Sequence, residues 1–350
     1  MIMKALVYGG SGIREWRDAP DPSLREPEDA IVAVDAVTIC GTDLHILKGD
    51  VPEVETGRIL GHEAVGTVVD VGNGVRGVAT GDRVLVSCIS ACGRCRYCRQ
   101  GRFGQCREGG GWILGHTIDG TQAEFVRTPF ADHSLYRLPP DLETEKALML
   151  ADIVPTAYEV GVLAGRVQPG DLVLVVGAGP IGLAAVRTAR LFSPARIVVV
   201  DPDPSRRARV LKAGADAAVE PGDDVAAAVR HGHHEDGADV AIEAVGTPGT
   251  FELCADLVRP GGRVANVGVH GSPATLHLEK LWTRDVTITT GLVDTSTTPL
   301  LIQMLHGGQL DVSDFVTHRF TLDAMEDAYD VFANAAENDA LKVALNREIA

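Results

Sequence analysis

Short apolar runs alternate with segments of helical period from about Val154 onwards. Apolar runs bounded by glycine or charged residues predict buried strands, and the amphipathic segments between them predict helices. The predicted strands are Leu172–Val176, Ile197–Val200, Ala217–Val219, Val240–Glu243, Val264–Val267 and Val286–Thr289, and the predicted helices are Gly182–Phe192, Ser205–Ala213, Asp223–His231 and Pro248–Val258. This alternation is typical of a doubly wound parallel sheet, so the predicted fold class is α/β.

The N-terminal part of the chain has a different pattern, with short strands separated by glycine turns. Its predicted strands are Met3–Tyr8, Ala30–Val37, Ala64–Val71 and Asp82–Val86. Such a series favours a β-rich, partly closed barrel. After Gly291 the chain leaves the parallel sheet. There we expect a strand or turn within Asp311–Phe320, an amphipathic helix over Leu322–Ala335 and a last strand at Leu341–Leu345.

The strand at Leu172–Val176 leads directly into Gly177, Gly179 and Gly182, which have G-x-G-x-x-G spacing. The first glycine makes a tight turn, the second lets a pyrophosphate approach the backbone, and the third lets helix and strand pack closely. Asp201 ends the next strand, about 20 residues further on, where a carboxylate binds ribose hydroxyls. A purely structural glycine turn is the alternative, but the strand–turn–helix context favours a dinucleotide site.

Composition narrows the class of protein. The 350 residues carry 32 basic and 48 acidic side chains, a net charge of −16, which argues against a nucleic-acid or anionic-membrane binder. The length suggests about two domains. We see neither a signal peptide nor an apolar span long enough for a bilayer, and we therefore expect a cytoplasmic protein with a small-molecule substrate.

Four of the seven cysteines cluster as C-x2-C-x2-C-x7-C, formed by Cys92, Cys95, Cys98 and Cys106. Four thiolates so close in sequence can enclose one tetrahedral zinc ion in a closed, structural site. An iron–sulfur cluster is the rival interpretation, but the last gap is long and no proline follows Cys106. Thiols without a metal are the remaining alternative, but the spacing of the four cysteines favours a metal site.

A second group contains Cys40, His62 and Asp152, which have the right chemistry for a zinc ion with an open position. Taken alone, a cysteine and a histidine are more often core residues, and an aspartate before a helix is usually a cap. Spacing alone leaves this site open.

Several motifs together resemble the zinc-dependent, medium-chain alcohol dehydrogenase family. They are C-G-T-D-x-H at Cys40–His45, G-H-E-x-x-G at Gly61–Gly66, the four-cysteine lobe and G-x-G-P-x-G at Gly177–Gly182. The resemblance covers nearly the whole chain. It implies a GroES-like catalytic domain over 1–153 and 292–350, with the zinc lobe at 88–107, and a Rossmann domain over 154–291.

The resemblance also implies roles for single residues. Cys40, His62 and Asp152 become catalytic zinc ligands, with Glu63 beside the ion or binding it. Asp43 would accept a hydrogen bond from His62, Thr42 would bind the substrate hydroxyl, and His45 would end a proton relay. An aspartate as third ligand is similar to bacterial secondary alcohol dehydrogenases, several of which lack the structural zinc. Gly41 replaces an arginine that some members use for the pyrophosphate.

For the cofactor, we expect NAD(H), because the Asp201 carboxylate would repel a 2′-phosphate. Arg206 could soften that repulsion or simply lie on an exposed helix face. The remaining cofactor contacts are those that the resemblance implies: Thr156 and Val245, the turn residues Pro180 and Ile181, Val267, Gly268 and Val269 on the carboxamide side, and Lys342 at the pyrophosphate.

Trp112 and Leu292 suggest an apolar substrate pocket with Thr42 and His45, with core packing as their alternative role. A small or medium secondary alcohol is the first expectation, and a polyol or threonine-type dehydrogenase is the second. A non-catalytic, NAD-binding sensor that keeps only the structural zinc is the third. The resemblance implies a homotetramer, or else a dimer, with the strand near Val286–Thr290 at the interface.

Overall fold

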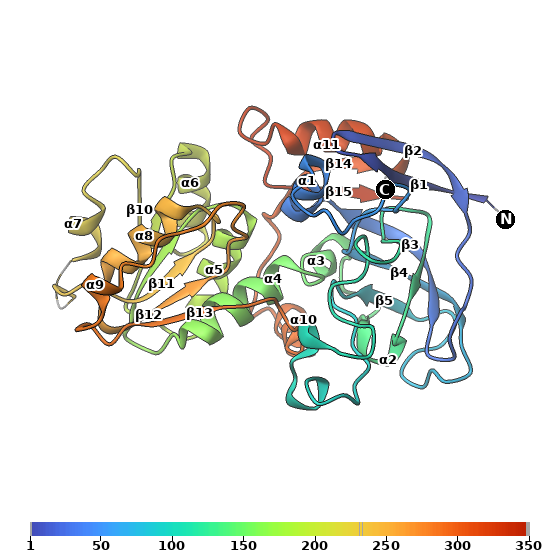
Figure 1. The fold of residues 1–350 in the computed structure, drawn as a ribbon, viewed down its shortest axis with the longest axis horizontal. Coiled ribbons are helices and arrows are strands. Elements are labelled where there is room, and N and C mark those ends of the chain that lie inside the picture. The colour runs from blue at the N-terminus through green and yellow to red at the C-terminus, as the bar shows by residue number, and fades with distance from the viewer. Residues whose placement is uncertain (1, 231, 233, 348–350) are drawn as a thin grey trace. The chain divides into compact units, whose positions relative to one another are not determined.

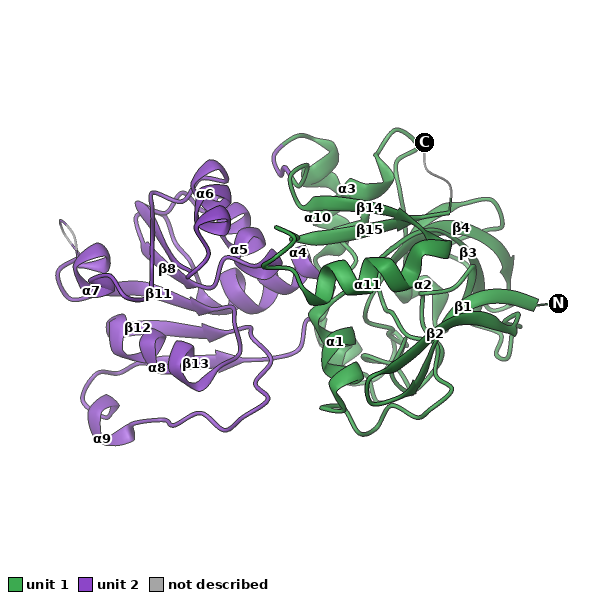
Figure 2. Cartoon of the chain, turned by 90° about the horizontal axis from the view of Figure 1, so that it is seen from above, with its two compact units in different colours: residues 1–152, 294–308, 312–350 green, residues 153–293, 309–311 purple. Residues whose placement is uncertain are grey.

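The computed structural model describes residues 2–230, 232 and 234–347. The chain divides into two compact units (Figure 2). Unit 1 contains the chain up to Asp152, residues 294–308 and the chain from Val312, and unit 2 contains Ile153–Val293 and Gln309–Asp311. The sequence placed these boundaries after 153 and before 292, and it did not anticipate that 309–311 return to unit 2.

Unit 1 is rich in strands (Figure 1). Its elements are β1 (Ile2–Gly10), β2 (Ile13–Pro20), β3 (Ala30–Thr38), α1 (Gly41–Lys48), β4 (Ala64–Val71), β5 (Arg83–Val86), η1 (Cys98–Gln100), η2 (Phe103–Gln105), β6 (Phe125–Thr128), α2 (Ala131–Ser134), β7 (Leu135–Arg137), α3 (Thr144–Leu148), α10 (Thr298–His306), β14 (Val316–Thr321), η4 (Leu322–Ala324), α11 (Met325–Ala333) and β15 (Lys342–Asn346).

Strands β1 and β2 pair with each other, and the main sheet of unit 1 combines β3–β7 with two strands from the C-terminal part of the chain. The strand order of this main sheet is β14-β15-β3-β4-β5-β7, and β6 pairs with β3. The C-terminal strand β15 lies antiparallel to β3, with Ala344 opposite Thr38. Thr38 and Ile39 lead directly into Cys40, so this register brings the end of the chain beside the first metal motif.

Unit 2 is a parallel sheet covered by helices (Figure 1). Its elements are α4 (Ile153–Thr156), the π-helical η3 (Ala157–Leu163), β8 (Leu172–Val176), α5 (Pro180–Arg190), β9 (Arg196–Val200), α6 (Pro204–Lys212), β10 (Ala217–Val219), α7 (Val225–Val229), β11 (Ala238–Glu243), α8 (Pro248–Leu257), β12 (Val258–Asn266), α9 (Leu278–Leu281) and β13 (Thr287–Thr290). The strand order β10-β9-β8-β11-β12-β13 corresponds to 3-2-1-4-5-6, the order of dinucleotide-binding sheets. The predicted doubly wound parallel sheet is confirmed.

Some predicted elements differ from the observed ones. The helix expected over Asp223–His231 is shorter and spans Val225–Val229, and His231 lies outside the described residues. The helix expected from Leu322 begins with a 3-10 turn before α11. The sequence analysis did not identify β2, whose side chains are mostly exposed and form no apolar run.

Candidate active site and metal centres

Helix α1 positions the first part of the site. Cys40 is its N-cap, and the Asp43 carboxylate accepts a hydrogen bond from the Cys40 backbone N–H at 2.9 Å. This local bond closes the first turn at its N-terminus. Thr42 and His45 are three residues apart and therefore share one face of the helix. The Thr42 hydroxyl lies 3.7 Å from the Cys40 sulfur.

Four side chains converge as a candidate metal site in unit 1. One donor atom from each of Cys40, His62, Glu63 and Asp152 lies within 4.8 Å of every other. The Asp152 carboxylate is central, because its Oδ2 lies 3.4 Å from the Cys40 sulfur and 3.4 Å from His62 Nε2. The structure therefore brings together the four residues that the resemblance indicated.

The electrostatics of this group fit a dication. Burial, together with the Asp152 charge, raises the pKa of the Cys40 thiol. Burial opposes protonation of His62, but hydrogen bonds to Asp152 and Cys40 outweigh it and raise its pKa. Glu63 Oε2 is buried and has no hydrogen-bond partner among the described residues. A thiol, an imidazole and two carboxylates are ordinary zinc donors, so the residues present fit a zinc ion.

Lys342 lies in an environment that the sequence analysis did not expect. Its side chain is 1 % exposed, and its ammonium donates to Glu63 Oε1 at 2.8 Å and to the Ile39 carbonyl at 3.0 Å. Burial lowers the pKa of Lys342, but the charge and hydrogen bond of Glu63 together with the charges of Cys40 and Asp152 outweigh burial and raise it. The expected pyrophosphate contact is thus replaced here by a buried ion pair beside the metal donors.

Asp43 faces His62 from the other side of the site. Asp43 Oδ1 lies 3.8 Å from His62 Nδ1, which is longer than a hydrogen bond. That carboxylate oxygen is buried and has no other partner in the described chain. Asp43 Oδ1 thus faces the ring nitrogen that does not face the metal donors, but the hydrogen bond that the resemblance implied is not formed at this distance.

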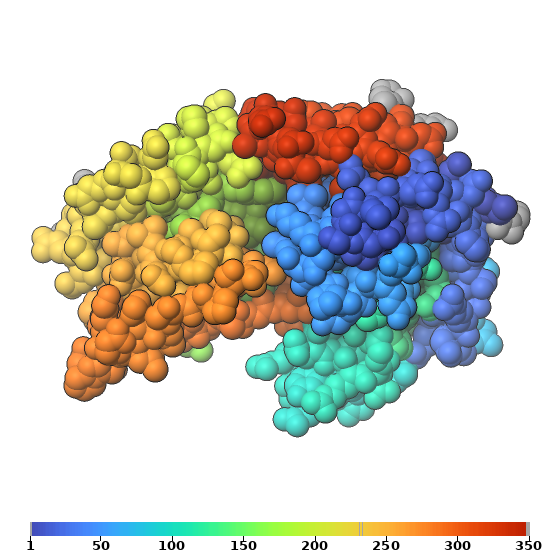
Figure 3. Space-filling view, turned by 45° about the horizontal axis from the view of Figure 1, so that its top comes forward, coloured from blue at the N-terminus to red at the C-terminus, as the bar shows by residue number. Residues whose placement is uncertain are grey.

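The four-cysteine lobe forms the second candidate metal centre. One sulfur from each of Cys92, Cys95, Cys98 and Cys106 lies within 4.8 Å of the others. Backbone N–H groups of Arg107 and Cys98 lower the pKa of Cys95 to about 6, which favours a thiolate. The lobe projects from the surface of unit 1, in teal in Figure 3. Four thiols in one small loop fit a structural zinc ion.

The predicted substrate residues fall in different units. In unit 1 the Trp112 ring meets the His62 ring edge-on, with 6.4 Å between centroids. Trp112 also stacks on His116 at 4.2 Å, and the sequence analysis did not single out that histidine. Leu292 belongs to unit 2 and is 44 % exposed.

The glycine turn of unit 2 has the predicted construction. Gly177 has a φ of +102°, which favours glycine, and a Cβ on Gly182 would lie 1.8 Å from the Gly177 carbonyl oxygen. A Cβ on Gly179 would meet nothing within 4 Å, so this position is open to a ligand. Asp201 is buried at the end of β9, and its Oδ2 accepts from the Ala178 N–H at 2.7 Å.

The other expected cofactor residues are distributed over unit 2. Their positions are Pro180 and Ile181 at the start of α5, Thr156 in α4, Val245 after β11, Val267, Gly268 and Val269 after β12, and Arg206 in α6. Val245 and Val269 are exposed, at 47 % and 65 %. The Arg206 guanidinium lies 3.9 Å from Asp203, the N-cap of its own helix, which agrees with a surface role.

Sequence reasoning missed three residues around the metal site, of which Cys88 contacts a donor directly and the other two lie behind Asp43. Cys88 donates from its backbone N–H to Ala151 O at 3.1 Å, and its sulfur lies 3.8 Å from Asp152 Oδ1. Gln122 and Tyr329 form a buried hydrogen-bonded pair next to Asp43. Only Cys88 carried a sequence signal, since it is a cysteine at the start of the predicted lobe segment 88–107.

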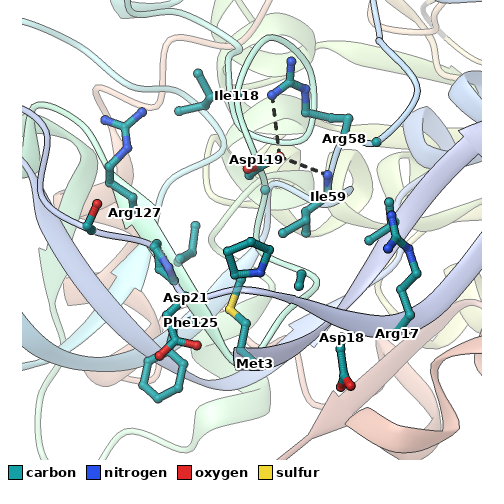
Figure 4. A pocket seen from close by; sticks show the side chains of 18 of the residues that line it. Met3, Arg17, Asp18, Asp21, Arg58, Ile59, Ile118, Asp119, Phe125 and Arg127 are labelled. Carbon is teal, nitrogen blue, oxygen red and sulfur yellow. Dashed lines mark hydrogen bonds and ion pairs between the residues drawn. The ribbon is translucent and has the colours of Figure 1, made fainter. Parts of the chain in front are cut away.

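A separate hollow of about 520 Å³ lies elsewhere in unit 1 (Figure 4). Its walls come mainly from β1, β2, β6 and the segments around Arg58 and Asp119. Arg58 and Arg127, two of its arginines, are already paired with Asp119 at 3.5 Å and Asp29 at 3.1 Å. None of the predicted site residues lines it, so we do not assign the chemistry to this hollow.

Within the described residues, the structure contains no helix that is long and apolar enough to span a membrane.

The family models agree with the fold and the metal centres. The model described as "Alcohol dehydrogenase GroES-like domain" matches residues 26–140, and the model described as "Zinc-binding dehydrogenase" matches residues 180–306. The chain belongs to the zinc-dependent, medium-chain alcohol dehydrogenase family. It is an oxidoreductase that acts on alcohols, and the alternative of a non-catalytic sensor is set aside.

Individual relatives match over almost their whole length. An alcohol dehydrogenase of Cupriavidus necator is 35 % identical over 364 residues, covering 98 % of each chain. The structure of zinc-dependent alcohol dehydrogenase 2 from Streptococcus pneumonia, in its apo form, has a TM-score of 0.95 and 46 % identity over 99 % of each chain. A zinc-binding dehydrogenase from Sinorhizobium meliloti, solved with NADP bound, has a TM-score of 0.86 and 28 % identity over 99 % of each chain.

Proposed function

We propose that this zinc enzyme oxidises a small or medium-sized secondary alcohol reversibly, with NAD as hydride acceptor. The observation that carries the proposal is the convergence of Cys40, His62 and Asp152, with the Thr42 hydroxyl 3.7 Å from the Cys40 sulfur. A cysteine, a histidine and a carboxylate leave a position open for substrate at a zinc ion. The Trp112 ring beside His62 adds an apolar wall suited to an alkyl substituent.

Two groups of residues have distinct tasks in this mechanism. Bound zinc would supply Lewis acidity that lowers the pKa of the substrate hydroxyl, and bound nicotinamide would supply the hydride acceptor. Cys40, His62 and Asp152 would hold the metal. Glu63 lies beside them, and its Oε1 is kept in place by Lys342.

Thr42 and His45 provide the proton path. Thr42 Oγ1 accepts the hydroxyl proton of the substrate and passes its own proton towards His45. His45 Nδ1 lies 2.8 Å from the Asp50 carboxylate, so its Nε2 is the nitrogen left to receive the proton. The His45 side chain is 32 % exposed, which gives the proton an exit to water.

A panel of initial rates tests the substrate class. With NAD at saturation, we expect the highest kcat/KM for 2-butanol, and much lower values for a polyol such as sorbitol and for threonine. Preference for sorbitol or threonine would instead assign the chain to the polyol or threonine type. Metal analysis of the same preparation should find about two zinc ions per chain. A count of about one would contradict the proposed catalytic metal site.

The cofactor preference is tested separately. The Asp201 carboxylate supports NAD, because a 2′-phosphate beside it would be repelled. The Arg206 guanidinium, which could soften this repulsion, lies 3.9 Å from the Asp203 carboxylate. The Sinorhizobium meliloti relative was solved with NADP bound, so the rates of this chain with NAD and with NADP need to be compared directly. A higher kcat/KM with NADP than with NAD would overturn the assignment.

We also propose a cytoplasmic homotetramer, with a dimer as second choice. No disulfide joins the seven cysteines, all of which lie in the described part of the chain, and this suits a reducing compartment. Strand β13 is the last strand of its sheet, and Trp282 and Leu278 nearby are 78 % and 62 % exposed. Such an edge with apolar neighbours is typical of an interface. Light scattering after gel filtration measures the mass directly, and a monomer would contradict the proposal.

A further inference from the structure

A continuous series of buried hydrogen bonds runs from helix α11 to the metal motif of helix α1. The Tyr329 hydroxyl donates to Gln122 Oε1 at 2.8 Å, and Gln122 Nε2 donates to Asp43 Oδ2 at 3.1 Å. The same Asp43 oxygen accepts from the Cys40 backbone N–H at 2.9 Å. Relative exposure is 0 % for Tyr329 and Gln122 and 1 % for Asp43, so each polar group depends on its neighbours for hydrogen bonds.

The series has a defined direction. Asp43 Oδ2 acts as an acceptor, so the Gln122 amide must turn its NH₂ group towards it. The amide oxygen then needs a donor, and the Tyr329 hydroxyl is that donor. A flipped amide would set its carbonyl oxygen against the Asp43 carboxylate, with two acceptors in contact. Tyr329 therefore favours the one amide orientation that supports Asp43.

Gln122 also touches the segment that carries His62. Its backbone N–H donates to the Leu60 carbonyl at 2.9 Å. A Cβ added to Gly61 would lie 2.5 Å from Gln122 Cγ, so the glutamine side chain packs directly on the residue before His62. The glutamine thus connects both sides of the Asp43–His62 contact.

The outer end of the series is fixed on α11. The Arg14 guanidinium lies 5.0 Å from the centre of the Tyr329 ring, and it donates to the Glu326 carbonyl at 3.3 Å. The ring is thereby held between the core of unit 1 and the arginine. Tyr329 belongs to the main apolar cluster of this unit.

We propose that Gln122 and Tyr329 are positioning residues for the catalytic metal site, acting through Asp43 on His62. They hold Asp43 so that its Oδ1 faces His62 Nδ1, which leaves His62 Nε2 directed at Asp152. Partners of this kind fix the tautomer and ring orientation of a metal-binding histidine. The inference rests on the metal role proposed above for His62.

The test measures zinc affinity in the full-length protein. Tyr329→Phe removes one hydroxyl oxygen and keeps the ring. Tyr8→Phe is the matched control, because Tyr8 belongs to the same apolar cluster but not to the hydrogen-bonded series. Cys40→Ala loses a proposed ligand of the catalytic zinc and keeps the lobe. In a chelator competition, the zinc that this variant lacks is therefore the catalytic one. We expect about tenfold weaker binding of that zinc in Tyr329→Phe and no change in Tyr8→Phe.

Three outcomes separate the possibilities. Unchanged zinc affinity in Tyr329→Phe would overturn the inference. An equal loss of thermal stability with and without zinc would also overturn it, because such a loss shows a merely structural role for Tyr329. If Cys40→Ala binds as much zinc as the wild type, the proposed catalytic site itself fails.

Gln122→Leu provides an independent variant of the same inference. It removes the amide from the series, so we expect a loss of zinc affinity at least as large as that in Tyr329→Phe. Adding Tyr329→Phe to Gln122→Leu should cost less than the sum of the two single effects, because the tyrosine acts through the amide. Additive effects would contradict the inference, and Tyr329→Phe alone decides it if Gln122→Leu does not fold.

Discussion

Lys342 and Glu63 form an ion pair in which both side chains are 1 % exposed. Removing one partner of such a pair leaves an uncompensated buried charge. We therefore expect Lys342→Met to lower the free energy of unfolding by about 3 kcal/mol or more. Denaturant unfolding measures this loss.

The double variant Lys342→Met/Glu63→Gln is the control, since it removes the orphaned charge. It should be clearly more stable than Lys342→Met alone. If the two variants are equally unstable, the loss arises from packing of the lysine stem and not from the charge.

Cys88 holds the segment of Asp152 by its backbone and by its sulfur, 3.8 Å from Asp152 Oδ1. Cys88→Ala should weaken binding of the catalytic zinc by about tenfold, because the ligand carboxylate loses an orienting contact. Cys88→Ser, with a hydroxyl donor, should recover most of the affinity. Cys254→Ala is the matched control, a buried free cysteine of α8 in unit 2. Equal zinc affinity in all three variants would refute the orienting role.

At the scale of elements, two glycines of the turn between β8 and α5 have different roles, one in folding and one in cofactor binding. A Cβ at Gly182 would lie 1.8 Å from the Gly177 carbonyl oxygen, so Gly182→Ala should destabilise the protein by about 1–3 kcal/mol. Gly179 has an ordinary φ of −68° and open space around it. Gly179→Ala should fold normally but raise the Kd for NAD by about tenfold, or ~1.4 kcal/mol. Calorimetric titration with NAD and thermal unfolding distinguish the two, and normal NAD binding by Gly179→Ala would contradict the pyrophosphate role.

The N-cap of α6 gives a dependence on pH. Burial opposes ionisation of Asp203, but hydrogen bonds from Ser205 outweigh it and lower its pKa. A lowered pKa in the folded state means that ionised Asp203 stabilises the fold above its unfolded pKa. This contribution disappears as pH falls through the lowered value. Asp203→Asn keeps a neutral cap, so the wild type should be more stable at pH 7 by roughly 0.5–1 kcal/mol.

Unfolding of both proteins at several pH values checks this expectation. The stability gap should close on acidification below the usual range of aspartate. A gap that stays constant with pH would show that charge at this cap is irrelevant.

The elements of unit 2 were predictable because their signals are local. Strand β8 is buried at every position and reads as one apolar run, and its observed limits match the predicted ones. Strand β2 has no such run, because most of its side chains face water and its pairing with β1 gives it its structure. The π-helical turns of η3 also carried no recognisable pattern.

The site was predictable only where its residues share a motif. The spacing of Cys92 and its three partner cysteines predicts their site, whereas Cys40 and His62 were assigned from the family resemblance. Lys342 was expected at a phosphate from the family resemblance, and nothing near it in the sequence indicates its contact with Glu63. Its contact depends on the pairing of β15 with β3, across some 300 residues of chain. Gln122 and Tyr329, separated by 207 residues, show the same limit.

At the scale of the whole molecule, each unit has its own apolar core. One cluster of buried side chains extends from Leu6 to Leu345 in unit 1, and another from Leu172 to Val264 in unit 2. The lobe has a third, much smaller cluster made largely of its own cysteines. The lobe therefore depends on metal ligation for its order, whereas the two units depend on apolar burial.

This difference predicts what metal removal does. Cys95→Ser should abolish zinc binding at the lobe and raise hydrogen exchange in the loop between Ser90 and Gly111, which is closed by backbone bonds between these two residues. Amides of β8 and β3 should keep their protection, because their cores contain no lobe residue. Hydrogen-exchange mass spectrometry with one peptide per element resolves the three regions. Loss of protection spreading into β3 would show that the lobe zinc stabilises the whole of unit 1.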